Sequence, residues 1–207
     1  MKRFTLLTIA AVALFVAVGC AKPPQEDISA AQAEMDKARQ AQAENWAPTE
    51  YRAADEAMNA AQAEIKAQDE KWFKNYDKAK ELLAKAKEDG AKASEAAAAN
   101  KEQAKKDAEA AMTAADTALQ SAEAALKVAP VTKDSKADLE LFKNDLATLH
   151  STLDGAKSSF GSEDYKKALE SANSVKDQAT SIATQLEAAK QKRTAAKTPG
   201  HTTTKKK

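Results

Sequence analysis

The sequence predicts an all-α protein built from long antiparallel helical hairpins whose helices pack through coiled-coil seams. From Ile28 onward the chain is rich in Ala, Lys, Glu and Gln, which are good helix formers, whereas glycine and β-branched residues are sparse. Apolar residues also recur every seven positions, interleaved at steps of three and four. That spacing is typical of a coiled-coil seam.

Several sets of apolar residues carry this seven-residue repeat. They are Ile28, Ala31, Met35 and Ala38; Tyr51, Ala54, Met58, Ala61, Ile65 and Trp72; Tyr76, Leu83, Gly90, Ala97, Ala104, Ala111, Ala118 and Ala125; Leu139, Phe142, Leu146, Leu149, Leu153, Ala156 and Phe160; and Tyr165, Ala168, Ala172, Val175, Ala179, Ile182, Leu186 and Ala189. From Gly90 to Ala125 the seam is nearly all alanine, and burial of alanine removes little apolar area from water. This stretch needs a close partner helix, so we expect a homo-oligomer or a helical protein partner.

Residues 1–19 have the layout of a secretory signal peptide. Two basic residues, Lys2 and Arg3, precede the uncharged stretch Phe4–Val18, and small residues follow. The run Ala17-Val18-Gly19-Cys20 resembles a bacterial lipobox, in which the cysteine thiol is diacylated and the chain is cut before it, although Ala17 stands where that motif more often has Leu. An uncut membrane anchor is the alternative, but a spanning helix needs about 20 apolar residues.

Residues 20–27 are predicted to contain the lipidated Cys20 and a tether. Pro23 and Pro24 favour an extended, stiff spacer, and the acyl chains would anchor the protein in a membrane. Ala21 stands where Asp favours inner-membrane retention in enteric bacteria, so this resemblance implies the periplasmic face of the outer membrane. Cys20 is also the only cysteine, which excludes disulfides within the chain.

The helical part is predicted to form two hairpin units, residues 28–128 and 135–193, with a linker at 129–134. The run Asn45-Trp46-Ala47-Pro48 should end the first helix, because proline clashes with the preceding helical turn, and Ala129-Pro130 should break the chain again. The first hairpin should turn within residues 69–75.

Helix starts are predicted from capping residues. Asn75 is a plausible N-cap, Ser135 with Asp138 fits a capping box, and Ser162 should open the last helix after a turn at 158–162. The helix that begins near Asn75 would extend to Val128, roughly 80 Å, which is longer than a compact bundle. Gly90 and Asn100 are the places where it would bend or break.

The two units form an internal repeat. At an offset of 88 residues, apolar residues of the first unit match apolar residues of the second. At an offset of 89 residues, Asn75-Tyr76-Asp77-Lys78-Ala79 matches Asp164-Tyr165-Lys166-Lys167-Ala168. The first match pairs Tyr51, Ala54, Met58, Ala61 and Ile65 with Leu139, Phe142, Leu146, Leu149 and Leu153. Each unit is therefore expected to be one antiparallel hairpin.

Two short motifs carry a family resemblance. Trp46-Ala47-Pro48-x-x-Tyr51, followed by Asn75-Tyr76-x-x-Ala79, resembles a group of alanine-rich bacterial envelope lipoproteins whose shared domain has no known function. The likeness covers about Ile28 to Lys101, and Asn75 departs from the usual Asp. The resemblance implies a helical hairpin at the cell envelope and implies no particular biochemical activity.

The sequence offers no catalytic, cofactor-binding or metal-binding residue, and we expect a protein that is not an enzyme and has no cofactor. His150 and His201 lack carboxylate or cysteine neighbours at metal-ligand spacing. The carboxylates fit surface ion pairs four residues apart, namely Glu81/Lys85, Glu88/Lys92 and Glu102/Lys106.

Five aromatic residues of the first unit allow two interpretations. They either form a patch that binds a sugar or a protein partner, or they fill the closed end of the hairpin, where alanine cannot fill space. The second interpretation is favoured because three of them fall on seam positions. The five are Trp46, Tyr51, Trp72, Phe73 and Tyr76.

Charge excludes one class of partner and singles out the C-terminal tail. Loss of Lys2 and Arg3 with the signal peptide lowers the basic count from 32 to 30 against 31 acidic residues, so nucleic acid is not an expected partner. Residues 194–207 are predicted to be a disordered basic tail. Its last residues, Lys205, Lys206 and Lys207, are candidate contacts to peptidoglycan. The terminal Lys207 resembles the wall-linked end of the major peptidoglycan-linked lipoprotein of enteric bacteria.

These features predict a lipid-anchored periplasmic coiled-coil lipoprotein with a structural or scaffolding role at the cell envelope. Its expected partners are the membrane, through acyl chains on Cys20, and peptidoglycan, through the basic tail. The alternative is an adaptor or regulator of a cell-wall enzyme or of an envelope secretion complex.

Overall fold

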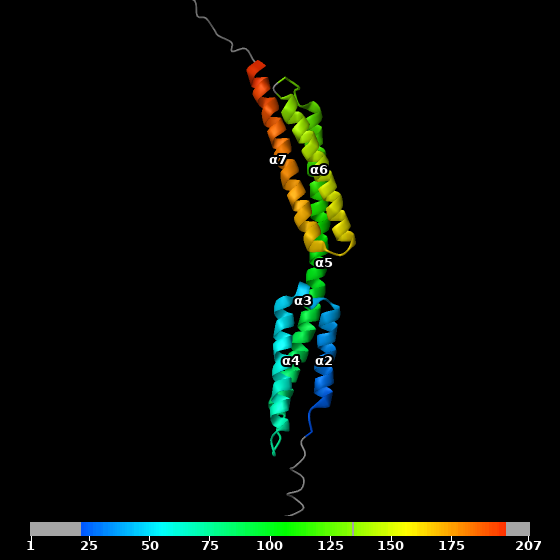
Figure 1. The fold of residues 1–207 in the computed structure, drawn as a ribbon, viewed down its shortest axis with the longest axis vertical. Coiled ribbons are helices and arrows are strands. Elements are labelled where there is room, and N and C mark those ends of the chain that lie inside the picture. The colour runs from blue at the N-terminus through cyan, green and yellow to red at the C-terminus, as the bar shows by residue number, and fades with distance from the viewer. Residues whose placement is uncertain (1–21, 134, 198–207) are drawn as a thin grey trace, which may run out of the picture. The chain divides into compact units, whose positions relative to one another are not determined.

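The computed structural model describes residues 22–133 and 135–197, and every regular element within them is an α-helix (Figure 1). The predicted all-α class is confirmed. The chain forms two compact units, which divide between Lys101 and Glu102, inside the longest helix, rather than at the expected linker 129–134. The helices are α2 (Gln25–Gln40), α3 (Ala43–Trp46), α4 (Pro48–Asp69), α5 (Asp77–Val128), α6 (Lys136–Gly161) and α7 (Tyr165–Lys197).

Unit 1 is a bundle of α2, α4 and the first part of α5, with the short helix α3 between α2 and α4 (Figure 1). Its core is dominated by alanine, which lets the helix axes approach closely. The buried residues form two clusters, one of Ala31, Ala57, Met58, Ala61, Leu83 and Ala86, and one of Ala38, Ala43, Ala47, Ala93 and Ala97.

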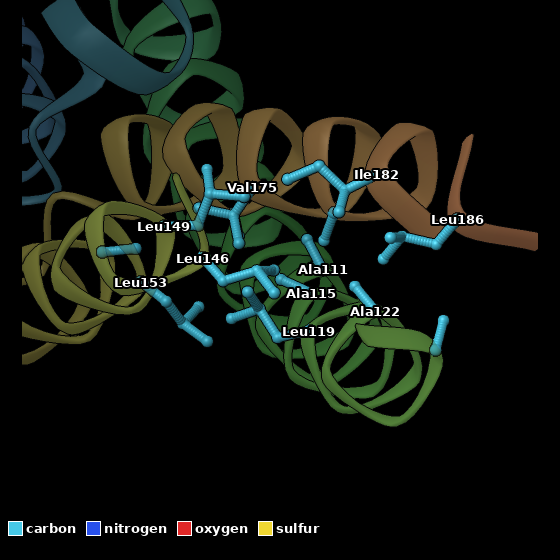
Figure 2. Packing of buried hydrophobic residues seen from close by; sticks show 14 residues of the cluster. Ala111, Ala115, Leu119, Ala122, Leu146, Leu149, Leu153, Val175, Ile182 and Leu186 are labelled. Atoms are coloured by element: carbon cyan, nitrogen blue, oxygen red, sulfur yellow. The ribbon is translucent and has the colours of Figure 1, made fainter. Parts of the chain in front are cut away.

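Unit 2 is a bundle of the second part of α5 with α6 and α7. The alanines of α5 lie against larger aliphatic side chains of the other two helices, so the seam that is poor in apolar area is covered within the unit (Figure 2). The partner helix that the alanine seam requires is thus supplied by the chain itself. The labelled core residues are Ala111, Ala115, Leu119, Ala122, Leu146, Leu149, Leu153, Val175, Ile182 and Leu186.

The two units repeat the same three-helix plan. Pro48 and Lys136, which begin α4 and α6, are 88 residues apart, as are Asp77 and Tyr165, which begin α5 and α7. The ends of α2 and α5 are also 88 residues apart. The internal repeat therefore extends to a third helix, because the last part of α5 occupies in unit 2 the place that α2 has in unit 1.

The connection between α2 and α4 differs from the prediction. Helix α2 ends at Gln40, earlier than the expected break at Asn45–Pro48, because Gln42 adopts a left-handed conformation with φ 58°. Pro48 does not end a helix but begins α4, where its missing N–H costs no hydrogen bond.

Two predicted caps are also corrected. Ser135 does not cap α6 with its side chain; instead its Oγ accepts from the backbone N–H of Thr132 at 2.8 Å and closes the loop before the helix. Helix α6 continues to Gly161, and the side chain that caps α7 is Asp164, whose Oδ1 accepts from the N–H of Lys167 at 3.2 Å. Ser162 instead follows the end of α6.

Helix α5 is continuous from Asp77 to Val128, without a break at Gly90 or Asn100. Gly90 is buried where α2 passes closely, and Asn100 Nδ2 donates to the backbone oxygen of Trp46, the last residue of α3, at 2.7 Å. From residue 98 to residue 107 no position of α5 is buried, and burial resumes at Ala108.

Two of the three predicted surface ion pairs form, and in the third the lysine has another partner. Lys92 pairs with Glu88 and Lys106 with Glu102, at 2.6 and 3.6 Å. Lys85 instead pairs with Asp89, the carboxylate one turn further along. Helix α7 extends to Lys197, so residues 194–197 of the predicted tail are helical.

Candidate functional site

The predicted lipidation site and the predicted wall contacts lie outside the described part of the chain. Cys20 precedes Lys22, the first described residue, and His201, Lys205, Lys206 and Lys207 follow Lys197, the last. The described surface feature with the clearest chemical character is instead the turn between α4 and α5. Residues 70–76 of this turn are called the tip below.

The tip exposes two adjacent aromatic side chains. Trp72 is 87% exposed and Phe73 is 76% exposed, and they are the two most exposed large apolar residues in the described ranges. The prediction that both fill the closed end of the hairpin is therefore wrong. Of the other three aromatic residues in that prediction, Tyr76 is buried as expected, while Trp46 and Tyr51 are half-buried.

A buried glutamine fixes the base of the tip. The Oε1 atom of Gln68 accepts from the backbone N–H of Asn75 at 3.2 Å, and its Nε2 donates to Glu64 Oε1 at 2.6 Å. Lys78 lies 3.3 Å from the other oxygen of Glu64. The hydrogen bond from Gln68, together with Lys78, lowers the pKa of the Glu64 carboxyl. The carboxylate therefore stays ionised and keeps accepting the bond that orients Gln68.

Tyr76 and Asp69 close the other side of the tip. The Tyr76 hydroxyl donates to Asp69 Oδ1, an interaction that raises the pKa of Tyr76 to about 12 and keeps the phenol protonated. Lys74 Nζ lies 3.7 Å from the same carboxylate oxygen. Asn75 is not the N-cap of α5 as predicted, because the helix begins at Asp77 and Tyr76 holds the N-cap position; the Oδ1 of Asn75 instead accepts from the N–H of Asp77 at 2.8 Å, in the turn before the helix. These bonds hold both ends of the tip.

In the equivalent turn of unit 2 the aromatic residue is packed against the protein and is not exposed as Trp72 is. Phe160, 88 residues after Trp72, is half-buried and packs on Tyr165 with ring centroids 5.1 Å apart. There α6 continues one turn further, to Gly161, whereas α4 ends at Asp69. A closed, aromatic-filled end is thus compatible with this hairpin, and the exposure of Trp72 is specific to unit 1.

Unit 2 carries one contact that the sequence did not predict. His150 Nε2 lies 2.8 Å from Glu123 Oε1, a residue of α5 that is 27 positions away. The pair borders an open groove of about 370 Å³, lined also by Leu126, Leu146 and Ala147. Within residues 22–133 and 135–197, no three His, Cys, Asp or Glu side chains gather as metal ligands would.

The tip presents apolar rings beside cationic side chains. Its outermost segment, Lys71 to Lys74, presents two exposed aromatic rings between two ammonium groups and contains no carboxylate. Apolar rings flanked by lysine are typical of side chains at a boundary between water and an apolar phase.

Two further findings concern membrane-spanning helices and similarity to known proteins. Of the helices in the described ranges, none is both long enough and apolar enough to cross a bilayer. No family model, no curated protein and no solved structure matches the chain.

Proposed function

We propose that this chain is a lipid-anchored envelope lipoprotein with a structural or scaffolding role in the periplasm. The observation that carries the proposal is the order of residues at the N-terminus: two basic residues, an uncharged run, small residues and then the only cysteine. Acyl chains at Cys20 contribute about 0.8 kcal/mol per buried methylene, which suffices for stable anchoring when several chains are present.

The helical units support a scaffolding role. Each buries most of its heptad positions internally, and its outer faces carry ion pairs such as Lys92–Glu88, so the chain can present a stiff, polar surface at a membrane. The resemblance to alanine-rich envelope lipoproteins points in the same direction.

Replacement of Cys20 by Ala tests the anchor. Without the thiol no diacylglycerol can be attached, so the Cys20→Ala protein should incorporate no palmitate and should leave the membrane fraction or retain its signal peptide. Metabolic labelling with palmitate followed by fractionation measures both effects. A Cys20→Ala protein that is still labelled and still membrane-bound would show that the lipobox interpretation is wrong.

The basic tail is proposed to contact the cell wall. Neutralisation of its end, in a Lys205→Gln/Lys206→Gln/Lys207→Gln protein, should weaken binding to purified sacculi several-fold at low salt. Exposed charges are screened beyond about 8 Å at physiological ionic strength, so the wild-type protein should elute as salt rises.

A matched control removes the same charge elsewhere. Lys127, Lys136 and Lys143 are exposed lysines of unit 2, and a protein with all three changed to Gln should bind sacculi like the wild type. Equal loss in both triple variants would mean that net charge matters and the tail does not. Protein that leaves the wall only after the wall is digested would indicate a covalent link, with Lys207 as the first residue to replace.

The groove beside His150 favours the second candidate, an adaptor for a wall enzyme or a secretion complex. It offers apolar side chains next to the hydrogen-bonded pair of His150 and Glu123, a combination that a partner helix or loop could occupy. Cross-linking from Ala147 in intact cells to one defined envelope enzyme would favour the adaptor over the scaffold.

A further inference from the structure

The tip of unit 1 lies at the same end of its bundle as the start of α2. Helix α2 leads away from the N-terminal tether, α4 returns and α5 leads away again, so the beginning of α2 and the α4–α5 turn share one end (Figure 1). The cores agree with this arrangement, because Ile28 near the start of α2 and Ile65 near the end of α4 pack against the same buried cluster.

The tether predicted at residues 20–27 is shorter than expected, because α2 already begins at Gln25, and it is too short to separate the anchor from this end. Lys22 is the first described residue, and Pro24, two residues further on, is already buried. Cys20 lies two residues before Lys22, and two residues of fully extended chain span at most ~7 Å. A bilayer that holds acyl chains on Cys20 therefore lies next to the tip.

We propose that the tip is a second membrane contact. Trp72 and Phe73 insert at the headgroup level of the bilayer that holds the lipid on Cys20, and Lys71 and Lys74 lie against its phosphate groups. The inference rests on the proposed lipid anchor and adds to it a site on the folded protein. Trp at the interface and Lys with its ammonium among the headgroups are the usual residues for this position.

Three observations support a contact at the tip, and the last of them favours a bilayer over a protein partner. The aromatic pair is exposed although the equivalent turn of unit 2 packs Phe160 on Tyr165, so the hairpin end does not force exposure. The bonds made by Gln68 and Tyr76 fix both ends of the tip. Two aromatic side chains bury at most ~500 Å² in total, whereas a stable protein interface buries about 800 Å² on each partner.

The charge of the tip fits the same surface. Within the tip, Lys71 and Lys74 carry two positive charges and Glu70 one negative charge, so the tip has a net charge of +1. Lys74 also lies 3.7 Å from the Asp69 carboxylate, and Asp69 and Asp77 are at the ends of the flanking helices. Each lysine near an anionic surface is worth roughly 1 kcal/mol, so the electrostatic contribution assists the insertion of the rings and does not replace it.

Tryptophan fluorescence can test the contact, because the chain contains only Trp46 and Trp72. The lipidated Trp46→Phe protein, with Trp72 as its sole tryptophan, is reconstituted into vesicles of phosphatidylethanolamine and phosphatidylglycerol, with and without brominated phosphatidylcholine. We expect brominated lipid to quench about half of the Trp72 emission, since an interfacial ring lies near the acyl boundary.

The Trp72→Phe protein is the matched control, with Trp46 as its sole tryptophan. Trp46 precedes α4, so the 22 residues of that helix, about 33 Å, separate it from the tip and brominated lipid should not quench it. A second comparison starts from the Trp46→Phe protein. Adding Phe73→Ser should reduce the quenching of Trp72 several-fold, whereas adding Val131→Ser, at a residue 72% exposed in unit 2, should not.

Flotation of the same vesicles separates the two proposals. Protein that floats with the vesicles while Trp72 emission is the same with and without bromine would overturn the tip contact and leave the anchor standing. Protein that does not float would overturn the anchor and, with it, this inference. A blue shift of Trp72 that depends on protein concentration and not on bromine would assign the tip to a protein surface and overturn the membrane contact.

Discussion

Replacement of Leu153 by Asp should lower the free energy of unfolding by about 3–5 kcal/mol. Leu153 is 1% exposed and belongs to the cluster that α5, α6 and α7 share in unit 2. The substitution removes the transfer energy of a buried leucine, leaves a cavity and places a carboxylate without a partner among apolar side chains. Urea unfolding of the full chain, followed by far-UV circular dichroism, measures the loss.

Leu141→Asp is the matched control for this change. Leu141 lies on the same helix but is 58% exposed, so the same substitution there should alter the free energy of unfolding by about 0.5 kcal/mol or less. The comparison cancels the lower helix propensity of Asp, which both variants share. Equal destabilisation by the two substitutions would remove Leu153 from the core and contradict the packing of unit 2.

The seven-residue repeat predicts most of the core because it reports which face of a helix is apolar. Met35, Met58, Leu83 and Val175 all fall on predicted seams and are all buried. The repeat does not report which helices share a core. The sequence therefore suggested hairpins, whereas α5 contributes to both units and completes a bundle of three long helices in each.

Helix ends were less predictable, since they depend on the conformation of single residues. Trp72 continues the seam from Ile65, but α4 ends at Asp69, so the repeat was extended past the helix and Trp72 was placed in a core that it does not reach. Gln42 takes a left-handed conformation that is uncommon for residues other than glycine, and nothing in its neighbourhood predicts it.

The candidate site was only partly visible in the sequence. Gln68 is seven residues after Ala61, so its burial could have been inferred, and a buried amide implies hydrogen-bond partners. The contact of His150 with Glu123 could not, because it depends on how α6 is aligned along α5. The aromatic pair of the tip was identified, and the end of α4 decides that it is exposed.

A close approach of α2 and α5 at Gly90 is the other constraint that the sequence did not reveal. A Cβ atom at Gly90 would lie 3.2 Å from Glu34 Cβ and 3.4 Å from the backbone nitrogen of Met35. Both are atoms of the neighbouring helix that cannot rotate away. The glycine therefore sets the spacing of the two helices, and it does not interrupt α5.

Gly90→Leu should consequently destabilise the protein by about 2 kcal/mol, although leucine is the better helix former. Overpacking costs about 1–3 kcal/mol, and the cost should be near the upper end here because α2 has to move away and open the site around Met35. The gain in helix propensity, about 0.8 kcal/mol, offsets part of it.

Gly155→Leu isolates the propensity effect, since Gly155 is exposed on α6 and a Cβ there would meet nothing within 4 Å. This variant should be more stable than the wild type by about 0.8 kcal/mol. The two glycine variants should thus shift the urea midpoint in opposite directions in the same circular dichroism assay. If Gly90→Leu were as stabilising as Gly155→Leu, α2 and α5 would not be in contact at Gly90, and the closely packed alanine core of unit 1 would be contradicted.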